Sequence, residues 1–207
     1  MLRTLFSGRV LRALFLLACL SLLGACGDRS ANWTLYDVKG HLPDLKFKLP
    51  AAGGSTLSSE DLKGKTVLLF FGYASCPDIC PTTLAQLSAV LQQLGERARN
   101  VRILFVSVDP HRDTPDILQA YVNAFNSQAL GVTGSEQQIA DLARRYRVAY
   151  QIEKPRPGDT ADHYDVTHSR GVYIFDKTGR ARLLASDTDS VADITRDLKQ
   201  LLDITQG

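Results

Sequence analysis

The chain has 207 residues, of which 44% are hydrophobic, 22% charged and 8% aromatic, and its formal net charge is +2. These values are typical of a globular protein and exclude a disordered chain, a collagen, a coiled coil and a protein with several membrane spans. Four cysteines in a chain of this length are too few for a disulfide-stabilised scaffold.

The N-terminal segment has the pattern of a bacterial secretion signal. Three arginines precede an apolar run from Ala13 to Leu23, and no acidic residue occurs before Asp28. The run is shorter than the ~20 residues that a spanning helix needs. The next residues, Leu23-Gly24-Ala25-Cys26, resemble a lipobox. We therefore predict a signal peptide over residues 1–25 and lipidation of Cys26; an uncleaved anchor helix is the alternative.

Cleavage after residue 25 would leave a lipidated tether over residues 26–42 and a domain over residues 43–207, facing the periplasmic side of a bacterial membrane. It would remove three arginines and change the net charge from +2 to −1, so charge gives no support for a nucleic-acid partner. Cys76 and Cys80 would then be the cysteines of the domain. Because a domain of this size buries a core without a disulfide, we expect this pair to have a chemical role.

The tether and the domain begin with short elements. Strands are expected at Trp33–Tyr36 and Phe47–Leu49, followed by a turn that Ser58 or Ser59 caps. The longer strands and helices that follow alternate. They are a strand at 66–73, a helix at 82–97 behind Pro81, a strand at 101–108, helices at 114–125 and 135–145, strands at 148–152, 170–175 and 181–185, and a helix at 190–202.

This order predicts an α/β fold. The strand–helix–strand unit at 66–108 implies two parallel strands with a right-handed crossover, and the hairpin at 170–185 adds antiparallel strands. We therefore expect a thioredoxin-like domain in which a mixed central sheet is flanked by helices on both faces.

Cys76 and Cys80 lie between a buried strand and a helix. Ligands bind at the carboxyl ends of strands in such sheets, and the start of a helix favours a thiolate. Their spacing of four would place both sulfurs on one side of a helical turn. Disulfide exchange and binding of a soft metal such as copper both remain open, and the structural alternative is a disulfide or two inert buried thiols. The cysteines have three residues between them, whereas the redox motif has two, and this difference favours the metal.

A third ligand is expected among the histidines. His41 lies in the tether and His111 follows the strand at 101–108, whereas His163 and His168 precede the strand at 170–175, which the topology places beside the cysteine strand. A thiol oxidoreductase of this fold has a cis-proline there, but this chain has no proline after residue 157. His168 is therefore the predicted third ligand; a hydrogen-bonded imidazole without metal is the alternative.

Together these motifs resemble the Sco/SenC family of membrane-tethered, thioredoxin-fold copper proteins over roughly Asp44–Leu202. The matching stretches are Lys63-Gly64-Lys65, Phe71-Gly72-Tyr73, Cys76-Pro77-Asp78-Ile79-Cys80-Pro81, Val108-Asp109-Pro110, Arg112-Asp113-Thr114-Pro115 and Tyr164 to Ser169. The resemblance implies that Cys76, Cys80 and His168 bind copper, as Cu(I) or Cu(II). The chain departs from the family pattern at Thr167, where an aspartate is usual, and at His111, where a glutamate is common.

The resemblance also implies a function and partners. The protein would be a metallochaperone that helps assemble the binuclear copper centre of cytochrome c oxidase. Its partners would be the copper-binding subunit of that enzyme and another periplasmic copper chaperone or a thiol reductant. The alternatives are a thiol-disulfide reductase that uses Cys76 and Cys80 as a redox-active pair, and a copper or redox sensor. Asp78, Asp109 and Asp165 are the carboxylates expected to orient or tune the ligands, and capping or loop ordering is the alternative for Asp109 and Asp113.

Overall fold

The computed structural model describes residues 32–155, 160 and 164–204. The chain divides into two units, residues 1–32 and residues 33–207, and the second unit carries the fold considered below. The predicted signal peptide, Cys26 and His163 lie outside the described residues.

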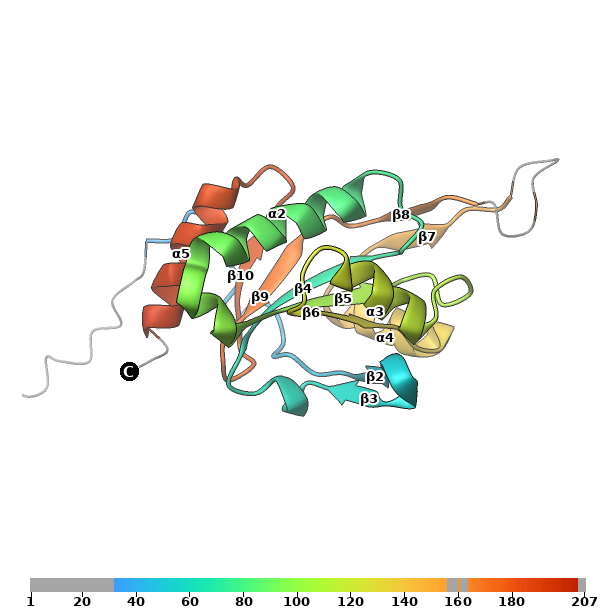
Figure 1. Ribbon diagram of the computed structural model, residues 1–207, viewed down its shortest axis with the longest axis horizontal. Helices are drawn as coiled ribbons and strands as arrows, with labels where there is room; N and C mark the ends of the chain where they lie inside the picture. Colours follow the sequence, from blue (N-terminus) through green and yellow to red (C-terminus); the bar gives the residue numbers. More distant parts are fainter. Residues whose placement is uncertain (1–31, 156–159, 161–163, 205–207) are drawn as a thin grey trace, which may run out of the picture. The chain divides into compact units, whose positions relative to one another are not determined.

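A six-stranded mixed sheet forms the centre of the second unit (Figure 1). Its strands are β1 (Tyr36–Asp37), β4 (Thr66–Gly72), β5 (Val101–Ser107), β6 (Ala129–Val132), β9 (Val172–Phe175) and β10 (Ala181–Ala185). They lie in the order β1-β10-β9-β4-β5-β6. Strands β4, β5 and β6 are parallel to one another, whereas the pairs β4–β9, β9–β10 and β10–β1 are antiparallel.

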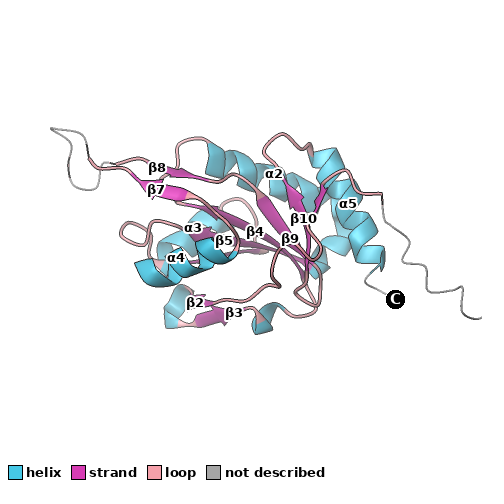
Figure 2. Ribbon diagram, turned by 180° about the vertical axis from the view of Figure 1, so that it is seen from behind, coloured by secondary structure: helices cyan, strands magenta, loops and turns pink. Residues whose placement is uncertain are grey.

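Two small hairpins lie outside this sheet. One pairs β2 (Lys48–Pro50) with β3 (Thr56–Ser58), and the other pairs β7 (Tyr150–Ile152) with β8 (Val166–His168). Figure 2 shows the β7–β8 hairpin extending outward from the sheet and the helices. The second hairpin is important for the site because His168 is its last paired residue.

The helices of the described residues differ in whether a side chain caps their first turn. They are α2 (Ile79–Leu94), α3 (Pro115–Asn123), α4 (Glu136–Arg145) and α5 (Val191–Ile204), with short 3-10 segments at Ala52–Gly54, Glu60–Leu62 and Gly95–Asn100. Thr114 caps α3 by accepting a hydrogen bond from the amide of Ile117. Ser135 and Gln138 form the capping box expected for α4.

Both faces of the central sheet are covered. All seven residues of β4 are buried, as expected for a parallel strand that lies between two layers. On one face Phe70 packs against Phe105, and Cys80 of α2 approaches Gly72. On the other face Phe71 packs against Tyr173, and Tyr173 packs against the residue that ends α4, Tyr146. The predicted thioredoxin-like arrangement is confirmed.

Several elements differ in position from their prediction. Strands β6 and β8 and the hairpin partner β3 were not expected, and β1 lies at Tyr36–Asp37 rather than at 33–36. Helix α2 begins at Ile79 rather than at Thr82. Pro81 is compatible with this earlier start, because residues in the first helical turn need no intrahelical N–H partner.

The described part of the predicted tether is attached to the domain. The buried carboxylate of Asp197 in α5 accepts hydrogen bonds from the amides of Thr34 and Leu35, at 2.7 and 2.8 Å. The amide of Val38 donates to the carbonyl of Arg182 in β10. Among the helices formed by described residues, none has the length and apolar character needed to cross a membrane.

Candidate metal centre

The two cysteines lie where β4 passes into α2. Strand β4 ends at Gly72, a short loop carries half-buried Cys76, and Cys80 is buried in the first turn of α2. The side chain of Asp78, the residue before the helix, makes no capping hydrogen bond. The amide of Cys80 instead points to Sγ of Cys76 at 3.4 Å, so the start of the helix provides an N–H donor to a sulfur.

Gly72 allows Cys80 to lie directly against the end of β4. A Cβ added at Gly72 would lie 2.6 Å from Sγ of Cys80 and 2.9 Å from the Phe105 ring. Both distances are below ordinary van der Waals contact. The strand must therefore end without a side chain at this position for the sulfur to keep its place.

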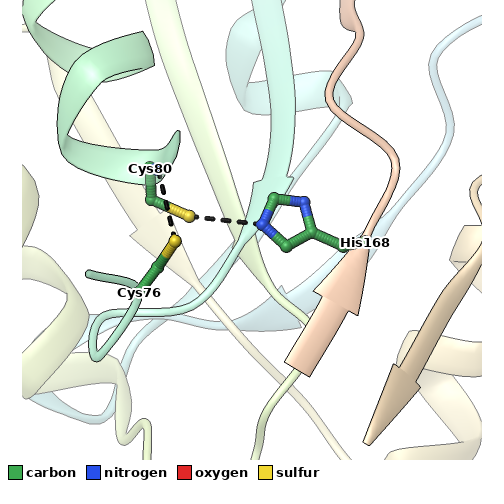
Figure 3. A group of neighbouring side chains, drawn as sticks. All are labelled: Cys76, Cys80 and His168. Atoms are coloured by element: carbon green, nitrogen blue, oxygen red, sulfur yellow. Dashed lines mark hydrogen bonds between the residues drawn. The ribbon is translucent and has the colours of Figure 1, made fainter. Parts of the chain in front are cut away.

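His168 faces the cysteines from the β7–β8 hairpin (Figure 3). Its Nε2 lies 3.5 Å from Sγ of Cys80, and the ligand atoms of Cys76, Cys80 and His168 all lie within 4.8 Å of one another. Its Nδ1 lies 2.9 Å from the carbonyl oxygen of Ser169. Because a carbonyl only accepts hydrogen bonds, this contact assigns the proton of a neutral ring to Nδ1 and leaves the lone pair of Nε2 facing the sulfurs.

Two aromatic rings pack against the imidazole. The rings of Phe70 and Tyr73 contact the ring of His168 nearly edge-on, with centroids 5.9 and 6.0 Å away. Phe70 comes from β4 and Tyr73 from the cysteine loop. The orientation of His168 therefore depends on the same strand and loop that position the cysteines.

Burial changes the proton affinities of the site. It raises the pKa of the Cys80 thiol well above its ordinary value, and the neighbouring Cys76 raises it further. Burial also lowers the pKa of the His168 imidazole, which favours the neutral ring. The pKa of Tyr73 is raised to about 12, again mainly by burial. At neutral pH the imidazole can therefore donate its lone pair, whereas Cys80 must lose a proton to bind a cation.

The donor set fits a soft cation. Two sulfurs and one imidazole nitrogen are the ligands that copper prefers, whereas magnesium and calcium prefer oxygen. Structural zinc sites take four protein ligands, and the cluster found among the described residues contains Cys76, Cys80 and His168 without a fourth. The chemistry of the site therefore matches copper better than structural zinc.

The carboxylates expected near the ligands occupy different positions. Asp78 and Asp165 are exposed and line a cleft of about 350 Å³ beside the metal centre, together with Cys76 and His168. Asp109 is fully buried and accepts a hydrogen bond from the hydroxyl of Tyr164 at 2.7 Å. In the structure Nδ1 of the imidazole instead bonds to the carbonyl of Ser169, a main-chain group that no side-chain pattern in the sequence indicates.

Asp113 anchors the loop that carries Cys76 through a hydrogen bond. Its buried carboxylate accepts hydrogen bonds from the amide of Ala74 at 2.9 Å and from the hydroxyl of Ser107 at 2.5 Å. This role corresponds to the loop ordering weighed for Asp113 from the sequence. His111 pairs instead with Glu136, with 2.9 Å between Nε2 and the carboxylate, and is mostly exposed.

Comparisons with known proteins match most of the described part of the chain. The family model described as SCO1/SenC matches residues 40–203. A SCO2-like protein of Rickettsia felis is 34% identical over 134 residues, which cover 65% of this chain and 64% of that protein. The matched part therefore spans just under two thirds of this curated relative.

Solved structures show the same likeness. Copper-bound ScoI of Bradyrhizobium japonicum aligns with a TM-score of 0.67 and 34% identity, covering 76% of this chain and 98% of that one. A SCO1/SenC family lipoprotein of Bacillus anthracis aligns with a TM-score of 0.63 and 26% identity, covering 84% and 98%. Because the family model matches well over half of the length of this chain, the chain belongs to the SCO1/SenC family.

Proposed function

We propose that the protein binds one copper ion through Cys76, Cys80 and His168 and delivers it during assembly of the binuclear copper centre of cytochrome c oxidase. The observation that carries this proposal is the convergence of two sulfurs and one imidazole nitrogen within 4.8 Å. Copper bound to the Bradyrhizobium relative supports the same choice of ion. The copper is cargo, and the three side chains are the groups that would hold it.

The exposure of the ligands suggests how the cargo would leave. Cys76 and His168 line the open cleft, whereas Cys80 is fully buried behind them. Thiolates of an acceptor protein would therefore reach the ion from the side of Cys76. We infer that Cys76 is the first ligand to be exchanged and Cys80 the last. The copper-binding subunit of the oxidase is the proposed acceptor, and a periplasmic copper chaperone or a thiol reductant would prepare the site.

We also propose that the protein is held on the periplasmic side of the membrane by lipid on Cys26. The apolar run and lipobox-like residues of the sequence support this, as does the lipoprotein relative from Bacillus anthracis. Intact mass spectrometry of protein extracted from membranes tests it. We expect a chain that starts at Cys26 with added acyl mass, and a Cys26→Ser variant without that mass.

The function is tested by replacing the third ligand. His168→Ala should abolish tight Cu(II) binding, because it removes the nitrogen donor and leaves the two thiols intact. His111→Ala is the matched control, since that histidine pairs with Glu136 away from the metal centre. Titration of reduced, purified protein with Cu(II), followed by absorption spectroscopy, measures the difference. An unchanged spectrum in His168→Ala would reject the assignment, and wild-type protein that takes up neither Cu(I) nor Cu(II) would reject the function.

A thiol-disulfide reductase is the second candidate. The approach of the two sulfurs to within 4.8 Å of each other favours it, because a dithiol pair can form a disulfide only where its sulfurs come together. This activity would need both cysteines, proceed without metal and be indifferent to His168. Turnover of an oxidised target peptide by metal-free wild type and His168→Ala distinguishes the two functions. A sensor would use the same site and differ in its partner.

A further inference from the structure

The hairpin that carries His168 is not a strand of the central sheet. Strands β7 and β8 pair with each other and with no third strand among the described residues. An isolated two-stranded hairpin is marginally stable in water. At the end next to β9, the amide of Ser169 donates to the carbonyl of Ala149, and the amide of Ala149 donates to the side-chain hydroxyl of Ser169 at 3.0 Å. These contacts join the two strands to each other. Its outer part therefore needs another attachment if the imidazole is to stay beside the sulfurs.

That attachment is a cluster of the buried Asp109 with the partly buried Arg112 and Tyr164, here called the arginine clamp. Asp109 and Arg112 lie in the connection between β5 and α3, and Tyr164 lies two residues before β8. The hydroxyl of Tyr164 donates to Oδ1 of Asp109 at 2.7 Å, and the guanidinium of Arg112 pairs with Oδ2 of the same carboxylate. Arg112 also donates to the carbonyl of Tyr164 at 2.9 Å.

The arginine clamp is shielded from water. The side chain of Asp109 has no exposed surface and that of Arg112 is 15% exposed. A charge-assisted contact in such a setting is stronger than one at the surface, and loss of one partner is costly because the other stays buried. The contacts of the clamp can therefore stabilise the position of the hairpin.

The same guanidinium reaches the metal centre through aromatic rings. Arg112 stacks over the ring of Tyr164 at 3.8 Å and lies 5.5 Å from the centroid of Tyr73. Tyr73 in turn packs edge-on against the His168 ring. A continuous line of contacts thus runs from Asp109 through Arg112 and Tyr73 to the imidazole.

We propose that Asp109, Arg112 and Tyr164 are positioning residues that hold His168 beside the cysteines and thereby set the preference of the site for Cu(II) relative to Cu(I). The inference rests on the proposed copper function. Two thiolates are sufficient soft donors for Cu(I), whereas Cu(II) depends on the nitrogen ligand. Loosening the hairpin should therefore weaken Cu(II) binding and leave Cu(I) binding nearly unchanged.

The sharpest variant is Tyr164→Phe, which removes one hydroxyl and keeps the ring that Arg112 covers. Tyr121→Phe is the matched control, because the hydroxyl of Tyr121 is buried and has no hydrogen-bond partner among the described residues. Asp109→Asn tests the carboxylate. Asp176→Asn, in the turn between β9 and β10, controls for a general loss of stability. Cu(I) and Cu(II) affinities of each purified chain are measured by competition with chelators.

Tyr164→Phe and Asp109→Asn should each weaken Cu(II) binding by roughly 10-fold or more and change the Cu(II) absorption spectrum. Cu(I) affinity should stay within about threefold, and the two control variants should keep the wild-type ratio of the two affinities. Wild-type Cu(II) affinity and spectrum in Tyr164→Phe, or equal losses for both ions, would overturn the inference.

Hydrogen exchange provides a readout that needs no copper. Amides of β7 and β8 should exchange faster in Tyr164→Phe than in wild type, while those of β4 and β5 keep their rates. Unchanged exchange in the hairpin would contradict the clamp even if the wild type binds copper. Faster exchange in a protein that binds no copper would instead support the clamp as a structural attachment and reject the function and the copper preference.

Discussion

At the scale of single residues, the metal centre depends on where side chains are missing as well as on where they are present. Gly72 ends the cysteine strand, and its lack of a Cβ lets Sγ of Cys80 pack against the strand end beside Phe105. Cys80 cannot move away easily, because it is fully buried in the first turn of α2. The position of one proposed ligand is thus fixed by a glycine eight residues earlier in the chain.

Gly72→Ala should therefore displace Cys80 and weaken Cu(I) binding. The added Cβ would lie 2.6 Å from the sulfur. The side-chain and backbone shifts that make room for such a group cost about 1–3 kcal/mol of folding stability. Chemical denaturation measures the stability loss, and chelator competition measures the affinity. Gly64→Ala is the control. Gly64 has a φ of +83° and open space around it, so this variant should lose about 1–2 kcal/mol of folding stability without losing copper affinity. Equal Cu(I) affinities in Gly72→Ala and wild type would contradict the prediction.

At the scale of elements, the sequence predicts long or capped segments well. The buried strands β4 and β5 and the capped helices α3 and α4 have local signals that need no tertiary information. Strand β6 lacks such a signal because it is short and contains Gly131, where an added Cβ would lie 2.7 Å from the backbone of Leu118. That glycine weakens the strand pattern but allows α3 to pack closely.

The turn between β9 and β10 provides a test at this scale. The Asp176 carboxylate is almost completely buried and accepts hydrogen bonds from the amide and hydroxyl of Thr178, from the amide of Arg180 and from the guanidinium of Arg182. Burial by itself would raise the pKa of Asp176, but these hydrogen bonds outweigh it and lower the pKa below its ordinary value. The charged form therefore stabilises the fold.

Asp176→Asn should cost about 1–3 kcal/mol at pH 7. Because the folded-state pKa is lowered, the stabilisation is present above the ordinary carboxyl pKa of about 4 and is lost as the pH falls through the folded-state pKa. The difference in unfolding free energy between wild type and variant should thus become smaller towards low pH, as measured by urea unfolding between pH 7 and pH 3. Asp187→Asn, which breaks an exposed pair with Arg170, should cost less than about 1 kcal/mol. A gap that stays constant with pH would contradict this account.

At the scale of the whole molecule, the metal centre joins parts of the chain that are far apart in sequence. Cys80 and His168 are 88 residues apart. The cysteine pair could be located from a local motif, whereas His168 needed the predicted topology and the family resemblance. Asp109 could be named as a candidate from the sequence, but its cluster with Arg112 and Tyr164 could not be predicted, because that cluster depends on a three-residue strand whose pairing is decided by tertiary contacts.

Because the centre ties the β4–α2 junction to the β7–β8 hairpin, copper should stabilise the whole domain. Ligand that binds only the folded state at 100 times its Kd adds about 2.7 kcal/mol, which for a chain of this size corresponds to roughly 5–11 °C in Tm. Anaerobic thermal unfolding with Cu(I) measures the shift, and a thiol-competing chelator should reverse it. A variant with both Cys76→Ser and Cys80→Ser should show no shift, and Mg²⁺ should have no effect on wild type because it prefers oxygen ligands. An equal shift in the double variant would place the ion elsewhere on the molecule.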